Sequence, residues 1–390
     1  MYREIPFRGH ARRRREKEFR ATFSKELFIR FGKRTTANED FLFRGDGMYR
    51  ETPVSRLSTR RETGVSRYIF RGETMRFVTY IQQDHTKIGA LIDEHSLVDL
   101  NRGYLDLLCA QGSAEKSQEV FASSLKELLE GGENALHTAR KILSIAQKDL
   151  RRQPDSTPRP WLVSLDAVRL MAPIPDPSKV VAIGQNYRDH CLEQNVPIPD
   201  RPIIFAKFPT AVIGPNEPIV WDPSLTDQVD FEAELGVVIG KCARHVPQEQ
   251  AFDYIAGYVN GNDVSARDLQ FSDRQWVRGK SLDTFCPIGP YLVTQDEVPD
   301  PQNLAIRAIL NDVVMQDSST RHMIFSVAYL IEFITRAFTL LPGDIILTGT
   351  PHGVGVFRNP KIFMQPGDTI TIEVEHLGAL SNPCRAEHVE

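Results

Sequence analysis

The chain has 390 residues, of which 41% are hydrophobic and 25% charged, and its formal net charge at neutral pH is −4. This composition is typical of a globular protein long enough for one large domain and a smaller one. No apolar run approaches the roughly 18 residues that span a bilayer, and no N-terminal segment has the apolar stretch of a secretory signal. We therefore expect no membrane partner and a cytoplasmic protein, or a mitochondrial matrix protein if the source is eukaryotic.

The number and spacing of the cysteines argue against disulfide bonds and a structural zinc site. They are five in number, scattered, and without a CxxC pair, so they predict neither a disulfide framework nor a structural zinc site. The five are Cys109, Cys191, Cys242, Cys286 and Cys384.

Residues 1–74 differ in charge from the rest of the chain. They carry 19 Lys and Arg against 10 Asp and Glu, a net charge of +9, so the remaining 316 residues carry −13. With no sustained strand or helix period, they are expected to be a disordered tail, or an extension before a true start at Met75. Two other interpretations are a mitochondrial presequence, against which the acidic residues count, and a nucleic-acid-binding arm at residues 11–20, ARRRREKEFR. We expect no nucleic-acid partner.

Strand and helix patterns alternate over the next segment. The expected strands are 76–82, 87–93 and 95–101, and the expected helices are 104–111 and 124–150. Gly131 and Gly132 should split the second helical pattern, because glycine disfavours a helix interior. Residues 151–160, RRQPDSTPRP, have the composition of a linker. The sequence therefore predicts a small N-terminal α+β domain over residues 75–160.

The rest of the chain is rich in strand patterns punctuated by Pro and Gly. Two segments, LLPGDIILTG and MQPGDTITIEV, repeat the same Pro-Gly-Asp turn before a strand, and one clear helix pattern occupies residues 323–340. There is no Walker loop, GxGxxG, GxSxG or HExxH, which argues against nucleotide-binding, serine hydrolase and zincin functions. The expected fold class is α+β and mostly β, arranged as a roll or sandwich.

Two carboxylates stand close together in DFEAELGVVIG, residues 230–240. Glu232 and Glu234 alternate with apolar residues, so the pattern predicts a strand that carries both on one face. Asp263 follows Asn260-Gly261-Asn262, which is typical of a turn that aims the next side chain into a cleft. Three oxygen donors without His or Cys suit Mg²⁺, Mn²⁺ or Ca²⁺ rather than zinc. By pattern alone, the solvated face of an antiparallel strand is the more common explanation of such a glutamate pair.

Positive groups follow these carboxylates. Three carboxylates around a divalent cation leave a net charge of about −1, so an anionic substrate needs nearby cations. Arg267, Arg278 and Lys280 lie just downstream. A lone lysine such as Lys280 is more commonly a solvated loop residue.

Two further patterns have both a structural and a functional interpretation. His190 and Glu193 lie three apart, so on a helix Glu193 can orient the imidazole, although a surface salt bridge has the same spacing. Gly349, Gly353 and Gly355 either form a turn or let backbone N–H groups approach an anion.

Five segments resemble, in order, the motifs of the fumarylacetoacetate hydrolase superfamily: GQNYRDHCLEQN, DFEAELGVVIG, NGNDVSARDLQ, QWVRGKSLDTFCPIGP and DIILTGTPHGVGVFRNP. The chain is most similar to the fumarylacetoacetate hydrolase domain-containing protein 2 type. The resemblance implies a mixed β-sandwich roll as the catalytic domain over residues 170–384, in a homodimer. It also implies Mg²⁺ or Mn²⁺ held by Glu232, Glu234 and Asp263.

The same resemblance assigns the other site residues. It implies that Lys280 and Gln270 contact the substrate and that Thr350 contacts its carboxylate. A His190 and Glu193 dyad, on a lid that orders when substrate binds, would position a water or move a proton. Tyr187 and Gln185 either touch the substrate or belong to the scaffold.

The implied activity is that of a Mg²⁺-dependent enzyme on small 2-oxo or β-dicarbonyl acids, which reacts through a metal-stabilised enolate. Keto–enol tautomerisation of oxaloacetate is favoured. The alternatives are C–C hydrolysis of acylpyruvates such as fumarylpyruvate or acetylpyruvate, isomerisation or decarboxylation of 2-hydroxyhepta-2,4-diene-1,7-dioate, and, from another class, nucleic-acid binding through residues 11–20. Fumarylacetoacetate hydrolase itself has an additional upstream aspartate ligand in a motif absent here, which argues against its own substrate.

Overall fold

The computed structural model describes residues 75–110, 112, 120–152 and 159–387. The expectations for residues 1–74, including the arm at 11–20, and for residues 153–158 of the expected linker lie outside this part of the chain. Within it, no helix has both the length and the apolar character needed to cross a membrane.

The N-terminal elements form a meander followed by helices. They are β1 (Arg76–Gln82), β2 (His85–Leu91), β3 (Ser96–Asp99), α1 (Leu100–Ala110), α2 (Leu125–Glu130), α3 (Gly132–Arg152), β4 (Leu162–Ser164), a 3₁₀ turn (Leu165–Ala167) and β5 (Arg169–Leu170). The expected break at Gly131 and Gly132 is confirmed: Gly131 caps α2, and Gly132 has a φ of +61°. Helix α1 begins earlier than expected, because Asp99 accepts the Arg102 N–H and caps the first turn.

One long mixed sheet runs through the described chain in the order β4-β3-β2-β1-β14-β12-β11-β17-β6-β7. Its remaining strands are β6 (Val180–Gly184), β7 (Ile203–Lys207), β11 (Ala233–Ile239), β12 (Ile255–Asn262), β14 (Cys286–Thr294) and β17 (Ile345–Leu347), and β8 (Val212–Ile213) pairs with β14. Because β1 pairs antiparallel with β14, the N-terminal strands extend the sheet that carries the acidic residues.

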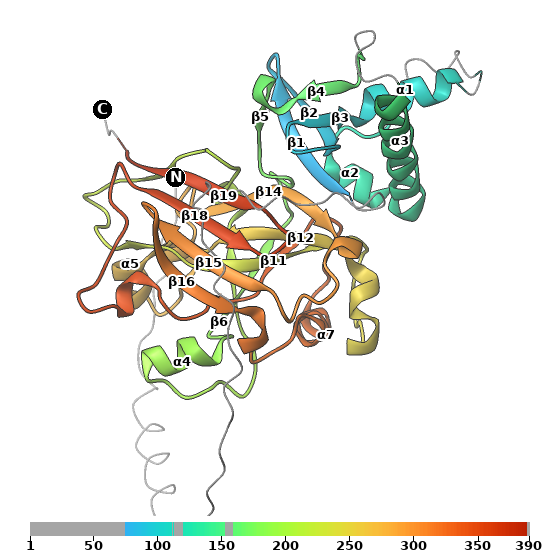
Figure 1. The fold of residues 1–390 in the computed structure, drawn as a ribbon. Helices are drawn as coiled ribbons and strands as arrows, with labels where there is room; N and C mark the ends of the chain where they lie inside the picture. Colours follow the sequence, from blue (N-terminus) through green and yellow to red (C-terminus); the bar gives the residue numbers. More distant parts are fainter. Residues whose placement is uncertain (1–74, 111, 113–119, 153–158, 388–390) are drawn as a thin grey trace, which may run out of the picture. The chain divides into compact units, whose positions relative to one another are not determined.

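A second sheet of five strands packs on the central part of the first. Its order is β16 (Val313–Ser319), β15 (Ala305–Leu310), β18 (Thr369–Val374), β19 (Ala379–Ala386) and β9 (Ile219–Trp221). Figure 1 shows β15, β16, β18 and β19, in orange to red, as a layer over β11 and β12. Alternate residues of β11, Leu235, Val237 and Ile239, enter the core between the two sheets, while Val238 enters the core on the other face. The predicted α+β, mostly β fold of packed sheets is confirmed.

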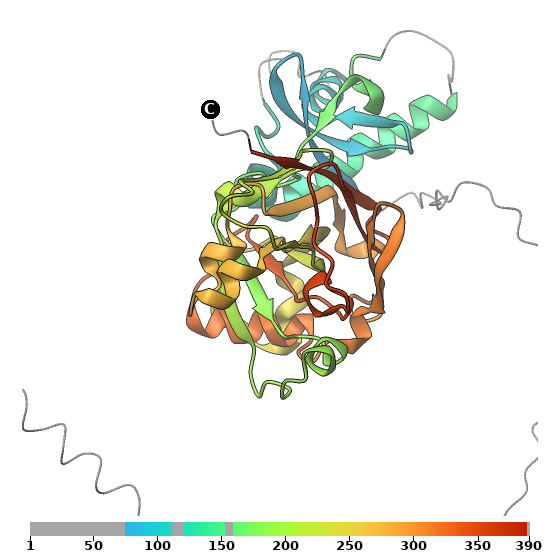
Figure 2. The ribbon, with the colours of Figure 1, turned by 90° about the vertical axis from the view of Figure 1, so that its left-hand side faces the viewer.

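Short helices connect the sheets. They are α4 (Arg188–Gln194), α5 (Arg267–Ser272), α6 (Val277–Lys280), α7 (Val327–Ala337) and 3₁₀ turns at Pro209–Ala211, Gln248–Tyr254, Gln295–Glu297, Thr320–His322 and Gly355–Phe357. In the view turned by 90° (Figure 2) and in Figure 1, α4 lies beyond the ends of the sheet strands.

Two local predictions are wrong. Residues 230–240 are not one strand: β10 (Val229–Asp230) pairs with β13 (Ser265–Ala266), and β11 begins at Ala233. Glu232 falls in the break because its N–H donates to the Asn262 side chain, 3.0 Å away, instead of to a ladder carbonyl. Residues Asn260 to Asn262 are not a turn but the end of β12, since Gly261 allows the close approach of Leu347 from β17.

Candidate active site

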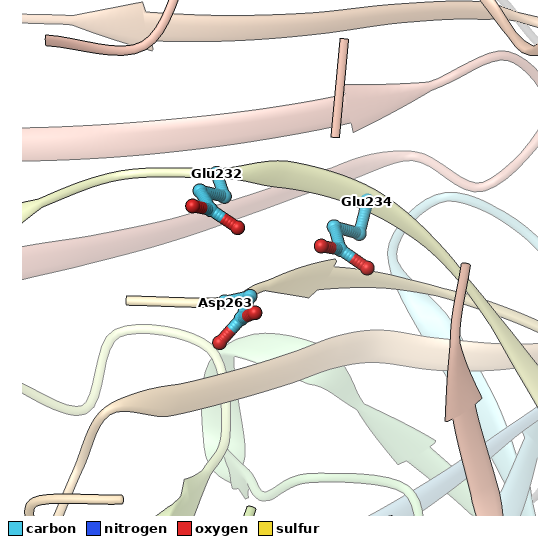
Figure 3. Close-up of side chains that lie close together, drawn as sticks. All are labelled: Glu232, Glu234 and Asp263. Carbon is cyan, nitrogen blue, oxygen red and sulfur yellow. The ribbon is translucent and has the colours of Figure 1, made fainter. Parts of the chain in front are cut away.

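Three carboxylates converge where β11 and β12 meet. Oxygens of Glu232, Glu234 and Asp263 lie within 4.8 Å of one another, and all three side chains are buried. Figure 3 shows Glu234 on β11, Glu232 just before it, and Asp263 at the end of the neighbouring strand, with their carboxylates facing the same space. A backbone hydrogen bond from the Asp263 N–H to the Glu232 carbonyl, 3.0 Å long, fixes the two segments to each other. The solvated strand face considered from the sequence is therefore excluded.

Three buried cations surround this cluster. Lys280 Nζ lies 2.9 Å from Glu232 Oε2 and 2.8 Å from Asp263 Oδ2. Arg267 Nη1 lies 2.7 Å from Glu232 Oε1, and Lys207 Nζ lies 2.5 Å from Asp263 Oδ1. Lys207 was missed by sequence reasoning, and its one signal was a lysine at the end of an apolar strand. Arg278, by contrast, is exposed and pairs with Asp273, so the structure does not bring it to the site.

The three carboxylates have different electrostatic surroundings. Burial alone would raise the pKa of Glu232, but Lys280 and Arg267 lower it to about 2. Burial, together with the charges of Asp263 and Glu232, raises the pKa of Glu234 well above its ordinary value. Among the described residues no cationic side chain pairs with Glu234, and its hydrogen bond is from the Gly349 N–H, 2.7 Å away. Glu234 thus lacks a positive partner.

A divalent cation fits this donor set. Asp230, Glu232, Glu234 and Asp263 are four buried acids, and Lys207, Arg267 and Lys280 are three buried bases, so the cluster has a net charge of −1 with every group ionised. A divalent ion would supply the charge that Glu234 lacks and change the total to +1, which suits an anionic ligand. The lysine contacts do not prevent this, because each carboxylate oxygen has a second lone pair.

The His190 and Glu193 pair lies beside the cluster rather than on an outer helix face. His190 is 5% exposed, and its Nδ1 lies 3.0 Å from Glu193 Oε2. The other oxygen of Glu193 accepts the Gly353 N–H at 2.8 Å, and this hydrogen bond fixes the orientation of the carboxylate toward His190. Because the carboxylate accepts at Nδ1, the ring proton lies there and Nε2 is left as an acceptor. The alternative of a surface salt bridge is excluded.

A cavity of about 170 Å³ borders His190 of the dyad and Glu232 of the acidic cluster. Among the residues that line it are His190, Glu232, Arg267, Gln270, Lys280 and Thr350. This volume is below the roughly 300–1,000 Å³ of sites for drug-sized molecules, so the cavity suits a small substrate. Gln185 also lines it, whereas Tyr187 does not: its side chain is buried in the core between the sheets.

The glycine-rich segment after β17 holds the acids in place. Gly349, Gly353 and Gly355 donate their N–H groups to Glu234, Glu193 and Asp230, at 2.7, 2.8 and 2.8 Å. The first two have a φ of +99°, which glycine adopts without strain. Both interpretations of these glycines therefore hold, since they form a turn and approach anions, and the anions are carboxylates of the chain itself.

Asp230 was also missed by sequence reasoning. Its carboxylate accepts from Arg267 Nε at 2.8 Å and from the Gly355 and Val356 N–H groups, so it fixes the guanidinium that reaches Glu232. Its proximity to the motif glutamates was the available signal.

Comparisons with known proteins show which family the chain belongs to. The family model described as the fumarylacetoacetate hydrolase C-terminal domain matches residues 179–385. The mitochondrial oxaloacetate tautomerase fahd2 of Xenopus laevis is 43% identical over 315 residues, which cover 80% of this chain and 90% of that protein. A fumarylacetoacetate hydrolase structure from Exiguobacterium antarcticum matches with a TM-score of 0.64 and 32% identity, over 80% of this chain and all of that one. A 2-hydroxyhepta-2,4-diene-1,7-dioate isomerase structure from Mycobacterium marinum matches with a TM-score of 0.59 and 34% identity, over 81% of this chain and all of that one.

Proposed function

We propose that this chain, which belongs to the fumarylacetoacetate hydrolase superfamily and is an enzyme of it, catalyses the keto–enol tautomerisation of oxaloacetate. The observation that carries the proposal is one small cavity lined by His190 of the histidine dyad and by Glu232 of the buried acidic triad. The similarity to oxaloacetate tautomerases supports the choice of substrate.

Glu232, Glu234 and Asp263 are the proposed ligands of Mg²⁺ or Mn²⁺. When bound, the ion supplies a Lewis acid that polarises a substrate carbonyl and makes the neighbouring C–H more acidic. The raised pKa of Glu234 is the feature of the chain that most favours a bound cation, because binding replaces like-charge repulsion by attraction.

The chain moves the proton with His190. Tautomerisation transfers a proton between the carbon beside the keto group and the keto oxygen, so it needs a base that can also return the proton. Glu193 keeps the Nδ1 proton in place, and Nε2 of His190 is then free to accept the proton and donate it back. Burial opposes the charge of Lys280, but Asp263 and Glu232 raise its pKa, so the protonated amine can stabilise negative charge on the substrate oxygen.

Three other groups are proposed to bind the substrate. Gln270 and Thr350 line the cavity and offer an amide and a hydroxyl to its carboxylates. Arg267 contributes positive charge next to Gln270, whose Oε1 accepts from it at 2.9 Å. Tyr187 is not brought to the cavity, so a direct contact with substrate would require it to move.

We also propose a homodimer, from the family resemblance. The compartment is proposed to be the mitochondrial matrix in a eukaryotic source, because relatives such as the Xenopus laevis protein are named as mitochondrial, and the cytoplasm in a bacterial one.

The test is to follow the ultraviolet absorbance of enol-oxaloacetate as it converts to the keto form. The purified chain with Mg²⁺ should accelerate the conversion, and removal of metal by a chelator should abolish the acceleration until Mg²⁺ is restored. No acceleration above the rate in buffer with Mg²⁺ alone would refute the tautomerase proposal.

Hydrolysis of acylpyruvates is the second candidate. The same dyad can activate a water instead of moving a substrate proton, and the Exiguobacterium antarcticum match is named a hydrolase. Incubation with acetylpyruvate, with acetate and pyruvate quantified by proton magnetic resonance, distinguishes the two: a tautomerase releases neither.

A further inference from the structure

Gln316 joins the acidic strand to the segment that carries Thr350. It lies on β16 of the second sheet and is fully buried. Its Oε1 accepts the Ala233 N–H at 2.8 Å, and its Nε2 donates at 2.9 Å to Thr350 Oγ1 and at 2.9 Å to the Pro351 carbonyl. Ala233 stands between Glu232 and Glu234, so one side chain sets the spacing between the acidic cluster and Thr350.

The orientation of this amide follows from its neighbours. The backbone N–H of Ala233 can only donate, so the atom that faces it is the oxygen. The carbonyl of Pro351 can only accept, so the atom that faces it is the nitrogen. Both neighbours require the same orientation, and the group that faces Thr350 is therefore a donor.

This orientation decides what the Thr350 hydroxyl does. Because Oγ1 accepts from Gln316, its own hydrogen must be donated elsewhere. Within the described part of the chain the Thr350 hydroxyl donates to no acceptor, and Thr350 lines the cavity. The hydrogen is thus available to a ligand.

We propose that Gln316 is a positioning residue that makes Thr350 a hydrogen-bond donor into the cavity. It selects substrates that present an acceptor there, such as an ionised carboxylate, over analogues that present a group that can only donate, such as an alkylammonium. This rests on the proposed function for the identity of the substrate, but the hydrogen-bond direction depends only on the chain.

The direct test is a Gln316→Glu variant, which keeps nearly the same shape but removes the donor. One carboxylate oxygen still accepts the Ala233 N–H, while the other can no longer donate to the Pro351 carbonyl. Thr350 must then donate to this second oxygen and present lone pairs to the cavity. We expect the KM for oxaloacetate to rise about tenfold, the loss of one hydrogen bond to a charged group, with kcat changed about threefold or less.

A double-mutant cycle separates positioning from a merely structural role. In a Thr350→Val background the hydroxyl is already absent, so adding Gln316→Glu should raise KM by about twofold at most. Thr350→Ser, which restores the hydroxyl, should bind about tenfold more tightly than Thr350→Val. Additive effects of the two substitutions, or equal binding by Thr350→Val and Thr350→Ser, would overturn the proposal. If Gln316→Glu does not fold, equal binding by Thr350→Val and Thr350→Ser still overturns the proposal.

Binding of succinate, measured by calorimetry, keeps this test independent of turnover. The same tenfold weakening in Gln316→Glu is expected for this unreactive dicarboxylate. A wild-type protein that binds succinate but does not tautomerise oxaloacetate would refute the proposed function and leave the hydrogen-bond direction tested. A wild-type protein that binds neither acid would overturn both.

Discussion

Lys207 and Asp263 form a buried ion pair, with 2.5 Å between Nζ and Oδ1, although 56 residues separate them in the chain. The lysine also donates to the Val264 carbonyl at 3.1 Å, so it supports the end of β12 as well as the charge of Asp263. Removal of the lysine should therefore destabilise the metal-free protein but strengthen its binding of Mg²⁺.

Replacement of Lys207 by Met should lower the free energy of unfolding of the metal-free protein by about 3–5 kcal/mol, because it leaves a buried carboxylate with one fewer cation. The same change should tighten Mg²⁺ binding at least about tenfold, since a positive charge near the proposed ligands is lost. Urea unfolding and titration calorimetry measure the two effects. Lys179→Met, which removes the partner of buried Asp344 elsewhere, is the control and should destabilise without changing Mg²⁺ affinity. Equal Mg²⁺ affinity in all three proteins would contradict the proposed ligand set.

The raised pKa of Glu234 predicts how the stability of the metal-free protein depends on pH. Below the ordinary value of 4.5 the group is protonated in both the folded and unfolded states. As the pH rises above 4.5, the unfolded chain releases this proton while the folded protein retains it, so the free energy of unfolding falls. Glu234→Gln should remove this part of the slope. Unfolding by urea across the acidic to neutral range, compared between wild type and variant, measures the difference, and identical slopes would show that Glu234 is not perturbed.

Saturating Mg²⁺ should abolish the fall in unfolding free energy with pH that Glu234 causes, because the ion stabilises the charged form of Glu234. The apparent affinity for Mg²⁺ should therefore rise with pH, with release of a proton on binding. Calorimetry in buffers of different ionisation enthalpy detects that proton. Uptake of a proton when Mg²⁺ binds would contradict this prediction.

Glu193→Gln should impair the dyad without removing the anchor on Gly353. The amide oxygen can still accept the Gly353 N–H, but the amide nitrogen then faces His190 Nδ1 and favours the tautomer with its proton on Nε2. We expect kcat to fall at least about tenfold, and His190→Gln to lower it by about 10²–10⁴-fold. Asp189→Asn, on the same helix and bonded to His352 rather than to the imidazole of His190, is the matched control. A larger loss of kcat in the control than in Glu193→Gln would assign the effect to the helix and not to the dyad.

Gly353 and Gly367 allow a test of the glycine-rich segment with backbone strain held equal. Their φ angles are +99° and +100°, but a Cβ at Gly353 would lie 2.5 Å from the Met315 carbonyl oxygen, whereas one at Gly367 would meet nothing within 4 Å. Gly367→Ala should cost about 1–2 kcal/mol of unfolding free energy through strain alone and leave turnover unchanged. Gly353→Ala should cost more and also lower kcat, because the segment must shift away from Glu193. Thermal unfolding and steady-state kinetics measure both, and full activity in Gly353→Ala would show that the Glu193 anchor is dispensable.

Much of the site could be predicted from local spacing. The two glutamates beside an apolar run, the histidine and glutamate three apart, and the glycines after a Pro-Gly-Asp turn are short-range patterns, because strand and helix periods place residues two or three apart on a common face. Family motifs in the same order extended these patterns to Lys280, Gln270 and Thr350, all of which line the cavity. The packed-sheet fold also followed from strand patterns and turn chemistry.

Only the tertiary structure decided which groups meet and with what charge. The period of residues 230–240 predicted one continuous strand, but a hydrogen bond from Glu232 to a side chain of β12 breaks it. Lys207 and Gln316 come from segments far from the motifs they support, and no local pattern reports such contacts, which depend on how strands pair and sheets pack. The sequence by itself determined the chemistry of the donors, whereas burial and long-range pairing determined that Glu232 is held ionised and Glu234 is left without a cation.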